Sequence, residues 1–161
     1  MSKQGLKEYG KFKEEIHTTL YKDCNIKELL LNDMTGMNAK EIQKSFKNHV
    51  KSHLFIDDTI TETESYIFYD IIMPNINANI KNCKIILYAV CHRDILDDYI
   101  KDGYYGNRAD ILSQMIEECL IQNDDVSYSF GIGKLSLDSV DIYNSTKLYG
   151  HIMYFSVPNF R

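Results

Sequence analysis

The sequence predicts an α+β fold, in which helices flank a mixed, mainly antiparallel sheet within a single domain. Three observations lead to this prediction. Residues 66–73 and 84–91 are short apolar runs typical of strands, and residues 107–122 carry apolar side chains at helical spacing. A polar turn at 75–82 joins the two strands, so we expect them to lie side by side and antiparallel.

The strand at 84–91 and the helix that follows it are the best-defined elements. Both faces of the strand are apolar, so we expect both to be buried. The apolar residues on one face of the helix are Ile111, Leu112, Met115, Ile116, Cys119 and Leu120. Asn107 can cap the helix, Asp110 suits the positive end of its dipole, and Asn123 can end it in a left-handed conformation.

The N-terminal part, residues 1–40, is predicted to be helical and to belong to the same single domain, 1–161. Apolar residues between positions 6 and 20 follow helical spacing. Gly10 lies within this pattern and weakens the helix by about 1 kcal/mol relative to alanine. A first helix is therefore expected here.

Two further helical segments are expected before the strands. The first begins at Asn25 and closes at residues 35–36, where a Thr-Gly pair favours a turn. The second begins at Asn38, with Glu41 placed for a capping box, and its apolar face continues to about His53.

The remaining strands are predicted near the C-terminus. Residues 127–134 and 135–143 flank a Gly-x-Gly turn, and residues 150–157 alternate in polarity. The apolar parity shifts near residues 138–139, as a bulge or bend requires. The acidic stretch 54–65 is expected to form a hairpin-like loop.

Composition limits the function. A chain of 161 residues and 18.8 kDa fits one domain, and a net charge of −5 argues against a surface that grips nucleic acid by neutralising phosphates. The four cysteines form no C-x-x-C pair, and two of them fall on predicted core faces. They are predicted to be reduced core residues: Cys24, Cys83, Cys91 and Cys119. The polar N-terminus and the lack of a long apolar run indicate a protein made inside the cell, with no membrane partner.

Patterns with catalytic or metal-binding potential have simpler explanations. The His-Arg-Asp sequence at 92–94 matches a kinase catalytic loop, but none of the other kinase motifs accompanies it. A metal site drawn from His49, His53 and His92 lacks an acidic or cysteine partner at zinc-like spacing. Cys91 precedes His92 on a strand, so the two side chains point to opposite faces and cannot form a dyad. We predict no enzyme activity, no cofactor and no metal site.

The loop between the second strand and the long helix has an unusual composition. Tyr104 and Tyr105 lie between Gly103 and Gly106, and Arg108 follows. Tyrosine and arginine dominate interface hot spots, and the glycines would let the aromatic rings project outward. The alternative is a loop whose tyrosines fold back onto the sheet.

Three short motifs carry a resemblance to a known group of proteins. They are Thr-Glu-Thr-Glu at 61–64 before an apolar strand, Gly-Tyr-x-Gly-Asn-Arg-x-Asp-x-Leu at 103–112 opening a helix, and Phe-Gly-Ile-Gly-Lys-Leu at 130–135. Over residues 42–155 the chain resembles the small neck proteins of tailed bacteriophages of Gram-positive hosts, the head–tail connector and tail-terminator group.

The resemblance implies a structural virion protein. Proteins of this group form rings, commonly six- or twelvefold, between portal and tail, and DNA passes through them without sequence-specific binding. The implied partners are identical subunits, a portal or adaptor protein, and tail-tube or other neck proteins. The implied location is the neck of the virion, after synthesis in the host bacterial cytoplasm. A monomeric intracellular adaptor that binds another protein, or a small enzyme, are the alternatives.

If the protein forms a ring, we expect two of its surfaces to make contacts in that ring. Tyr104, Tyr105 and Arg108 would anchor the subunit interface, in a heterologous contact that closes by rotation. The four carboxylates of the acidic segment cannot all be buried without partners, so this segment is expected to face the lumen or a neighbouring ring. Its acidic residues are Asp57, Asp58, Glu62 and Glu64.

Overall fold

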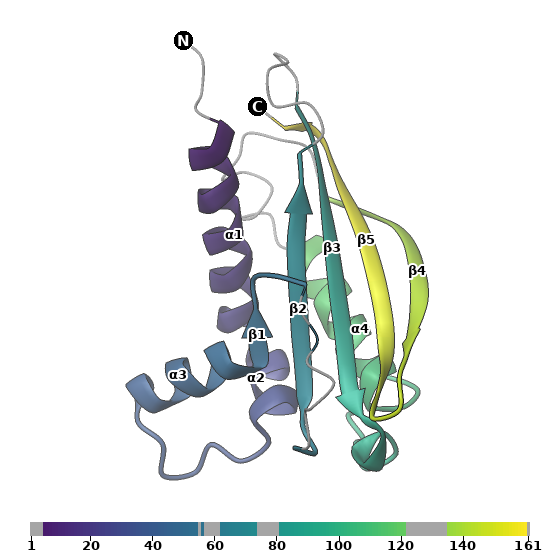
Figure 1. Ribbon diagram of the computed structural model, residues 1–161. Coiled ribbons are helices and arrows are strands. Elements are labelled where there is room, and N and C mark those ends of the chain that lie inside the picture. The colour runs from purple at the N-terminus through teal and green to yellow at the C-terminus, as the bar shows by residue number, and fades with distance from the viewer. Residues whose placement is uncertain (1–4, 55, 57–61, 74–80, 122–134, 161) are drawn as a thin grey trace.

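A computed structural model of the protein describes residues 5–54, 56, 62–73, 81–121 and 135–160 (Figure 1). Its helices are α1 (Gly5–Lys22), α2 (Cys24–Leu31), α3 (Ala39–His49), the 3₁₀ turn η1 (Arg93–Ile95) and α4 (Arg108–Ile121). Its strands are β1 (Val50–Lys51), β2 (Ser65–Ile72), β3 (Lys81–His92), β4 (Ser136–Asn144) and β5 (Leu148–Phe160). The predicted α+β class, with helices flanking a mostly antiparallel mixed sheet, is confirmed.

The described strands form one five-stranded sheet in the order β1-β2-β3-β5-β4. The short β1 runs parallel to β2, and the other pairs are antiparallel. The predicted antiparallel pairing of the first two long strands is therefore confirmed as β2 with β3. In this order β4 forms one edge of the sheet, and β1 with the free part of β2 forms the other (Figure 1).

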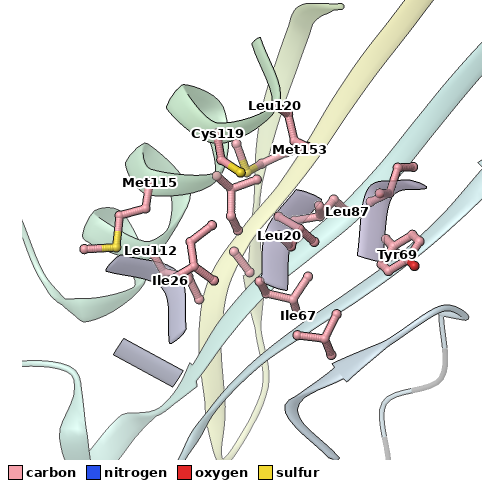
Figure 2. Packing of buried hydrophobic residues seen from close by; sticks show 14 of the residues in the cluster. Leu20, Ile26, Ile67, Tyr69, Leu87, Leu112, Met115, Cys119, Leu120 and Met153 are labelled. Carbon is pink, nitrogen blue, oxygen red and sulfur yellow. The ribbon is translucent and has the colours of Figure 1, made fainter. Parts of the chain in front are cut away.

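The main core lies between the helices and one face of the sheet. On this face β3 contributes alternate residues, including Leu87, and the paired strand β5 contributes Met153 (Figure 2). Opposite them, α4 presents Leu112 and Met115, while Leu20 reaches the same cluster from α1. Each fully buried aliphatic side chain of this kind stabilises the fold by about 1.5–3 kcal/mol. Because the helical spacing gathers these side chains on one face of α4, that face turns inward.

The far face of the sheet is only partly buried, which corrects the expectation for β3. Val90 is buried there with Tyr66 and Phe68 in a smaller cluster, but Ile86 and Tyr88 are partly exposed. The reason is tertiary, because α1, α2 and α4 all contribute to the cluster on the opposite face.

The ends of α2 and α3 differ from the predicted ones. The N-cap of α2 is Asp23, whose carboxylate accepts from the Ile26 N–H, and the helix closes at Asn32 with φ of 59°. Asn38 is the N-cap of α3 as predicted, but the helix ends at His49. The chain then enters β1, since Val50 can be buried as a strand residue beside β2. A two-residue parallel strand leaves no periodic signal in the sequence.

The predicted bulge near residues 138–139 is confirmed, because the β4–β5 register shifts between Leu137 and Ser139. β5 continues past Pro158, where the β3–β5 register is irregular between Lys81 and Cys83. A proline without an N–H is tolerated at such an irregularity. The predicted strand at 127–134 and the helix end at Asn123 lie outside the described residues.

Candidate functional site

The Gly103–Arg108 loop is held to the first turns of α4 by a set of short contacts. Asn107 Oδ1 accepts from the Asp110 N–H at 2.9 Å, and Asp110 Oδ2 accepts from the Asn107 N–H at 2.9 Å. This reciprocal capping box confirms Asn107 as the predicted cap. Gly103 and Gly106 both have positive φ angles, of 89° and 102°, which explains the glycine requirement in this loop.

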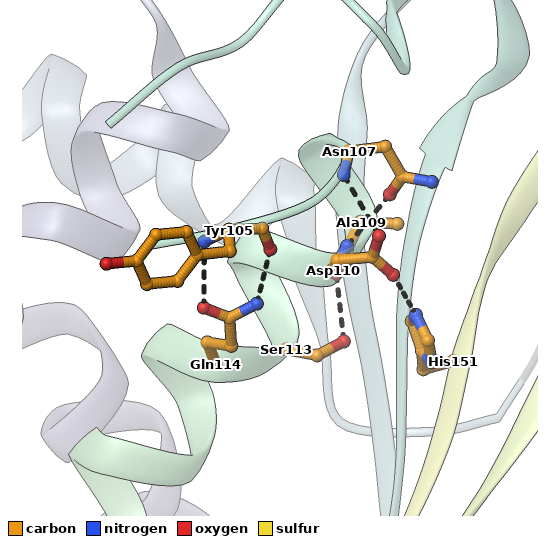
Figure 3. A network of polar contacts seen from close by, with 7 residues as sticks. All are labelled: Tyr105, Asn107, Ala109, Asp110, Ser113, Gln114 and His151. Atoms are coloured by element: carbon orange, nitrogen blue, oxygen red, sulfur yellow. Dashed lines mark hydrogen bonds and ion pairs between the residues drawn. The ribbon is translucent and has the colours of Figure 1, made fainter. Parts of the chain in front are cut away.

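Tyr105 is presented to solvent on a fixed backbone. Gln114 clamps it from α4: the Gln114 Oε1 atom accepts from the Tyr105 N–H at 3.2 Å, and Gln114 Nε2 donates to the Tyr105 carbonyl at 2.6 Å (Figure 3). Tyr105 is 78% exposed. A rigid backbone that carries an exposed tyrosine loses little conformational entropy when that ring is covered by a partner.

The other two predicted anchors have partners within their own chain. Tyr104 packs at the margin of the main core, and its hydroxyl donates to Glu118 at 2.7 Å, which raises the pKa of Tyr104 to about 12. Arg108 is buried and points inward, so it is not an outward-facing anchor. Of the two tyrosines, Tyr105 therefore projects outward, whereas Tyr104 folds back onto its own chain. An interface role for the loop stays a prediction, with Tyr105 as its exposed residue.

Arg108 joins α4 to the end of α2. Its Nη1 donates to the Leu29 carbonyl at 3.3 Å and to Asn32 Oδ1 at 3.0 Å, and its guanidinium lies 4.9 Å from the centre of the Tyr99 ring. A positive group beside the last carbonyls of a helix is favoured by the helix dipole. No sequence signal pointed to this role, because 76 residues separate Arg108 from Asn32.

An Asp–His pair connects α4 to the sheet. Asp110 Oδ1 lies 2.7 Å from His151 Nε2 on β5, while Asp110 Oδ2 is engaged with the Asn107 N–H (Figure 3). Nearby, the Ser113 hydroxyl donates to the Ala109 carbonyl at 2.9 Å. The observed contacts orient α4 on β5, and they place no nucleophile on the histidine. The pair is separated by 41 residues in sequence, so spacing could not reveal it.

Beside this pair a groove of about 350 Å³ runs between α4 and the edge of the sheet. Tyr105, Glu117 and Gln114 line its helix side, and Leu137, Val140 and Met153 line its sheet side. Val140 and Ile142 pair with Met153 and His151, so they lie on the helix-covered face of the sheet. They are nevertheless 47% and 66% exposed, because α4 lies mainly against β3 and β5.

We call this surface the β4 margin: the edge strand β4 with Tyr105 and Glu117 on the facing wall of the groove. Val140 and Ile142 were not predicted from the sequence to be surface residues. Their alternation is the same as that of a buried strand, so no local signal distinguishes them.

The acidic segment is described only in part. Asp57 and Asp58 lie outside the described residues. Glu62 is exposed, whereas Glu64 is half-exposed with partners in its own chain: His49 Nε2 at 3.5 Å and the Tyr66 hydroxyl at 3.5 Å. Its placement toward a lumen or another ring stays a prediction.

The three histidines considered for a metal site each have a different local environment. His49 Nδ1 contacts the Ser65 carbonyl at 2.8 Å, and His92 Nδ1 accepts from the Asp94 N–H as the cap of η1. His53 lies beyond the end of α3, so it is not one helical turn from His49 on the same helix. Among the described residues no group of three or more His, Cys, Asp or Glu side chains is arranged to hold a metal ion.

Comparison with protein families places this chain. The model of the family described as YomW matches residues 14–157, which include every described strand almost completely and most of the helical core. The chain belongs to the YomW family. None of the curated proteins matches it.

The name YomW is of the type given to protein families derived from Bacillus phages. Membership in the YomW family therefore supports a phage-related protein, which is the coarser part of what the sequence motifs imply. The name says nothing about a position in the virion. In the described part of the chain, no helix is both long and apolar enough to cross a membrane.

Proposed function

We propose that this YomW-family chain is a structural virion protein that forms a closed ring in the neck of a tailed phage, as a head–tail connector or tail terminator. DNA passes through the ring without sequence-specific binding. The phage-type family and the resemblance of the loop and strand motifs to neck proteins support the setting. The geometry of the β4 margin supports the assembly.

The observation that carries the proposal is the uncovered apolar edge. Within the described residues β4 pairs only with β5, so its outer backbone groups have no strand partner. Val140 and Ile142 add exposed apolar area beside that edge, and Tyr105 stands across the groove. An exposed apolar edge strand is a liability in a free monomer, and proteins normally cover it. A neighbouring subunit is the cover we propose.

The contact is expected to be heterologous. β4 lies at one edge of the sheet, and the β1 edge with α3 lies on the other side of the molecule (Figure 1). Two different surfaces on opposite sides join head to tail, and such contacts close into rings when each subunit is rotated from the last by a fixed angle. That angle is about 60° for a sixfold ring and about 30° for a twelvefold ring.

Mass measurement tests the proposal. Native mass spectrometry and light scattering of the full chain should give one large species of fixed stoichiometry, and immunogold labelling of virions should mark the neck. The double variant Val140→Asp/Ile142→Asp should remain folded, because both side chains are substantially exposed, and should lose the large species.

Ile100→Asp is the matched control, since Ile100 is 91% exposed and lies outside the β4 margin. It should assemble like the parent chain. A chain that stays monomeric at every concentration, with no label at the neck, would contradict the ring and favour the adaptor alternative.

A further inference from the structure

A row of lysines marks the side of the molecule opposite β4. Lys40, Lys44 and Lys47 occupy positions i, i+4 and i+7 of α3, so they share one face of the helix. Lys51 follows in β1. We call these four residues the lysine stripe. Residues 39–51 contain four lysines and one glutamate, a net charge of +3 in a chain whose net charge is −5.

The stripe is free to meet a partner. Lys40, Lys44 and Lys47 are exposed, and Lys51 is half-exposed. Among the described residues none of the four forms an ion pair with a carboxylate. Lys13 differs, because its charge is held by Asp70 at 2.9 Å.

The stripe ends at a hollow of about 300 Å³ between α1, the end of α3 and the residues after it. Lys47 and Lys51 line the hollow together with His17, and Glu14 is the one carboxylate among the described lining residues. Burial, and to a lesser extent the positive charge of Lys47, lowers the pKa of His17. Val50 and Tyr69 give the hollow an apolar floor.

The β4 margin carries the opposite charge. Asp138 and Asp141 are exposed on β4, Glu117 is exposed on the facing helix, and the strand contains no lysine or arginine. Asp138 Oδ1 accepts hydrogen bonds from the neutral hydroxyls of Ser136 and Ser156, so its charge is not cancelled by them. Two β4 edges brought together would place these aspartates near one another, which disfavours a symmetric β4–β4 dimer.

We propose that the lysine stripe of one copy docks against the acidic β4 margin of the next copy, head to tail. This inference rests on the proposed ring and names the two surfaces that form its contact. Three observations support a second copy as the occupant. The surfaces are of opposite charge, and they lie on opposite sides of one chain (Figure 1). Apolar side chains also lie beside Lys47 and Lys51 in the hollow and beside Glu117 in the groove, whereas Asp141 pairs with Ile152 and so projects from the other face of the edge strand. Phosphate groups could bind the lysine stripe, but a phosphate-bearing partner there would leave Val140 and Ile142 on the β4 margin uncovered.

Two charge-reversal variants test the contact. Lys44→Glu/Lys47→Glu places two glutamates in the middle of the stripe, removes its net positive charge and keeps the acidic margin, and Asp138→Lys/Asp141→Lys keeps the basic stripe and has a basic edge strand. Each variant alone should assemble at least about tenfold less readily than the parent, measured as the concentration at which half the protein is in the large species. Parent assembly should also weaken as salt is raised, because exposed charges are screened.

Mixing the two variants in equal amounts gives the decisive result. In the mixture the acidic margin of the first variant meets the basic stripe of the second, and the introduced lysines of the second meet the introduced glutamates of the first. An alternating ring should therefore form, recognisable in native mass spectrometry by equal content of the two chains. This recovery also shows that both variants are folded. Lys11→Glu/Lys22→Glu, two exposed lysines of α1 outside the stripe, is the control with the same change in charge.

The outcomes separate the two proposals. If the parent forms rings and Lys44→Glu/Lys47→Glu forms them equally well, the stripe is not the contact, although the proposed function stands. If both variants fail and the mixture also fails, the pairing of these two surfaces is wrong. If the stripe variant keeps its ring but loses salt-dependent binding to duplex DNA, the stripe contacts DNA and the inference is overturned. A parent chain that never assembles removes both proposals.

Discussion

At the scale of single residues, Arg108 shows how a side chain can have a purely internal role within a loop that is otherwise exposed. It follows the solvent-exposed Tyr105 by three positions, yet it is 6% exposed and ties the start of α4 to the end of α2. A buried charged group is stabilising only while its partners remain in place.

Arg108→Ala should therefore lower the free energy of unfolding by about 1.5–3 kcal/mol, because hydrogen bonds to a charged donor are lost and the Leu29 carbonyl loses a partner. Urea denaturation measures this change. Lys101→Ala is the comparison: Lys101 and Glu28 form a partly exposed pair at 3.2 Å, which should contribute about 1 kcal/mol or less. Equal losses in the two variants would show that Arg108 is not buried as described.

At the scale of elements, β3 and β5 approach each other so closely at Gly150 that a side chain there would disturb their pairing. Gly150 on β5 lies opposite Val90, and a Cβ at position 150 would collide with the Ala89 carbonyl oxygen. Glycine in a strand interior often marks such an approach. Gly10 on α1 has open space around it instead.

The two glycines predict opposite effects of the same substitution. Gly150→Ala should destabilise the protein by about 1–3 kcal/mol or more, since the strands must separate to admit the methyl group. Gly10→Ala should stabilise it by up to about 1 kcal/mol, because alanine is the better helix former. Thermal melting of both variants measures the sign directly. A neutral Gly150→Ala would mean that β3 and β5 are not in this register.

At the scale of the whole molecule, the cysteines report whether the core opens as a unit. Cys83, Cys91 and Cys119 are buried as predicted, but the prediction of a core position was wrong for Cys24, which is exposed. Burial raises the pKa of each of the three buried thiols to about 12. The thiolate is the reactive form, so these groups are protected both by access and by protonation.

One of the four thiols should react rapidly with a thiol reagent at neutral pH, and all four should react in denaturant. Mass spectrometry of the labelled protein identifies the site, which is expected to be Cys24. Rapid labelling of the three buried thiols in the native protein would contradict the positions of β3 and α4.

The same thiols make stability depend on alkaline pH. Their pKa values are raised in the folded state, so above about pH 9 the unfolded chain releases protons that the folded chain keeps. The free energy of unfolding should therefore fall as pH rises from about 9 toward 12, with these thiols as one contribution. Cys83→Ala should reduce the slope over this range.

Much of the fold was predictable from the sequence because its signals are local. Helical spacing fixed the inward face of α4, the Asn38–Glu41 and Asn107–Asp110 pairs marked two helix starts, and the parity shift located the β4 bulge. The lysine spacing on α3 was not singled out from the sequence, because its importance depends on what lies across the molecule. Caps, periods and parity involve neighbours a few residues apart, so the chain specifies them without tertiary contacts.

What only the tertiary structure decided are relations between distant segments. The inward turn of Arg108, the pairing of Asp110 with His151, and the parallel contact of β1 with β2 join residues that no spacing rule connects. The exposure of Val140 and Ile142 follows from where α4 lies on the sheet, because the same alternating pattern would be buried under a helix placed one strand further across. Likewise, the strand order alone puts the basic lysine stripe at one edge of the sheet and the acidic β4 margin at the other. Sequence set the local elements by short-range periodicity and capping, whereas packing between layers determined which of their surfaces stayed uncovered.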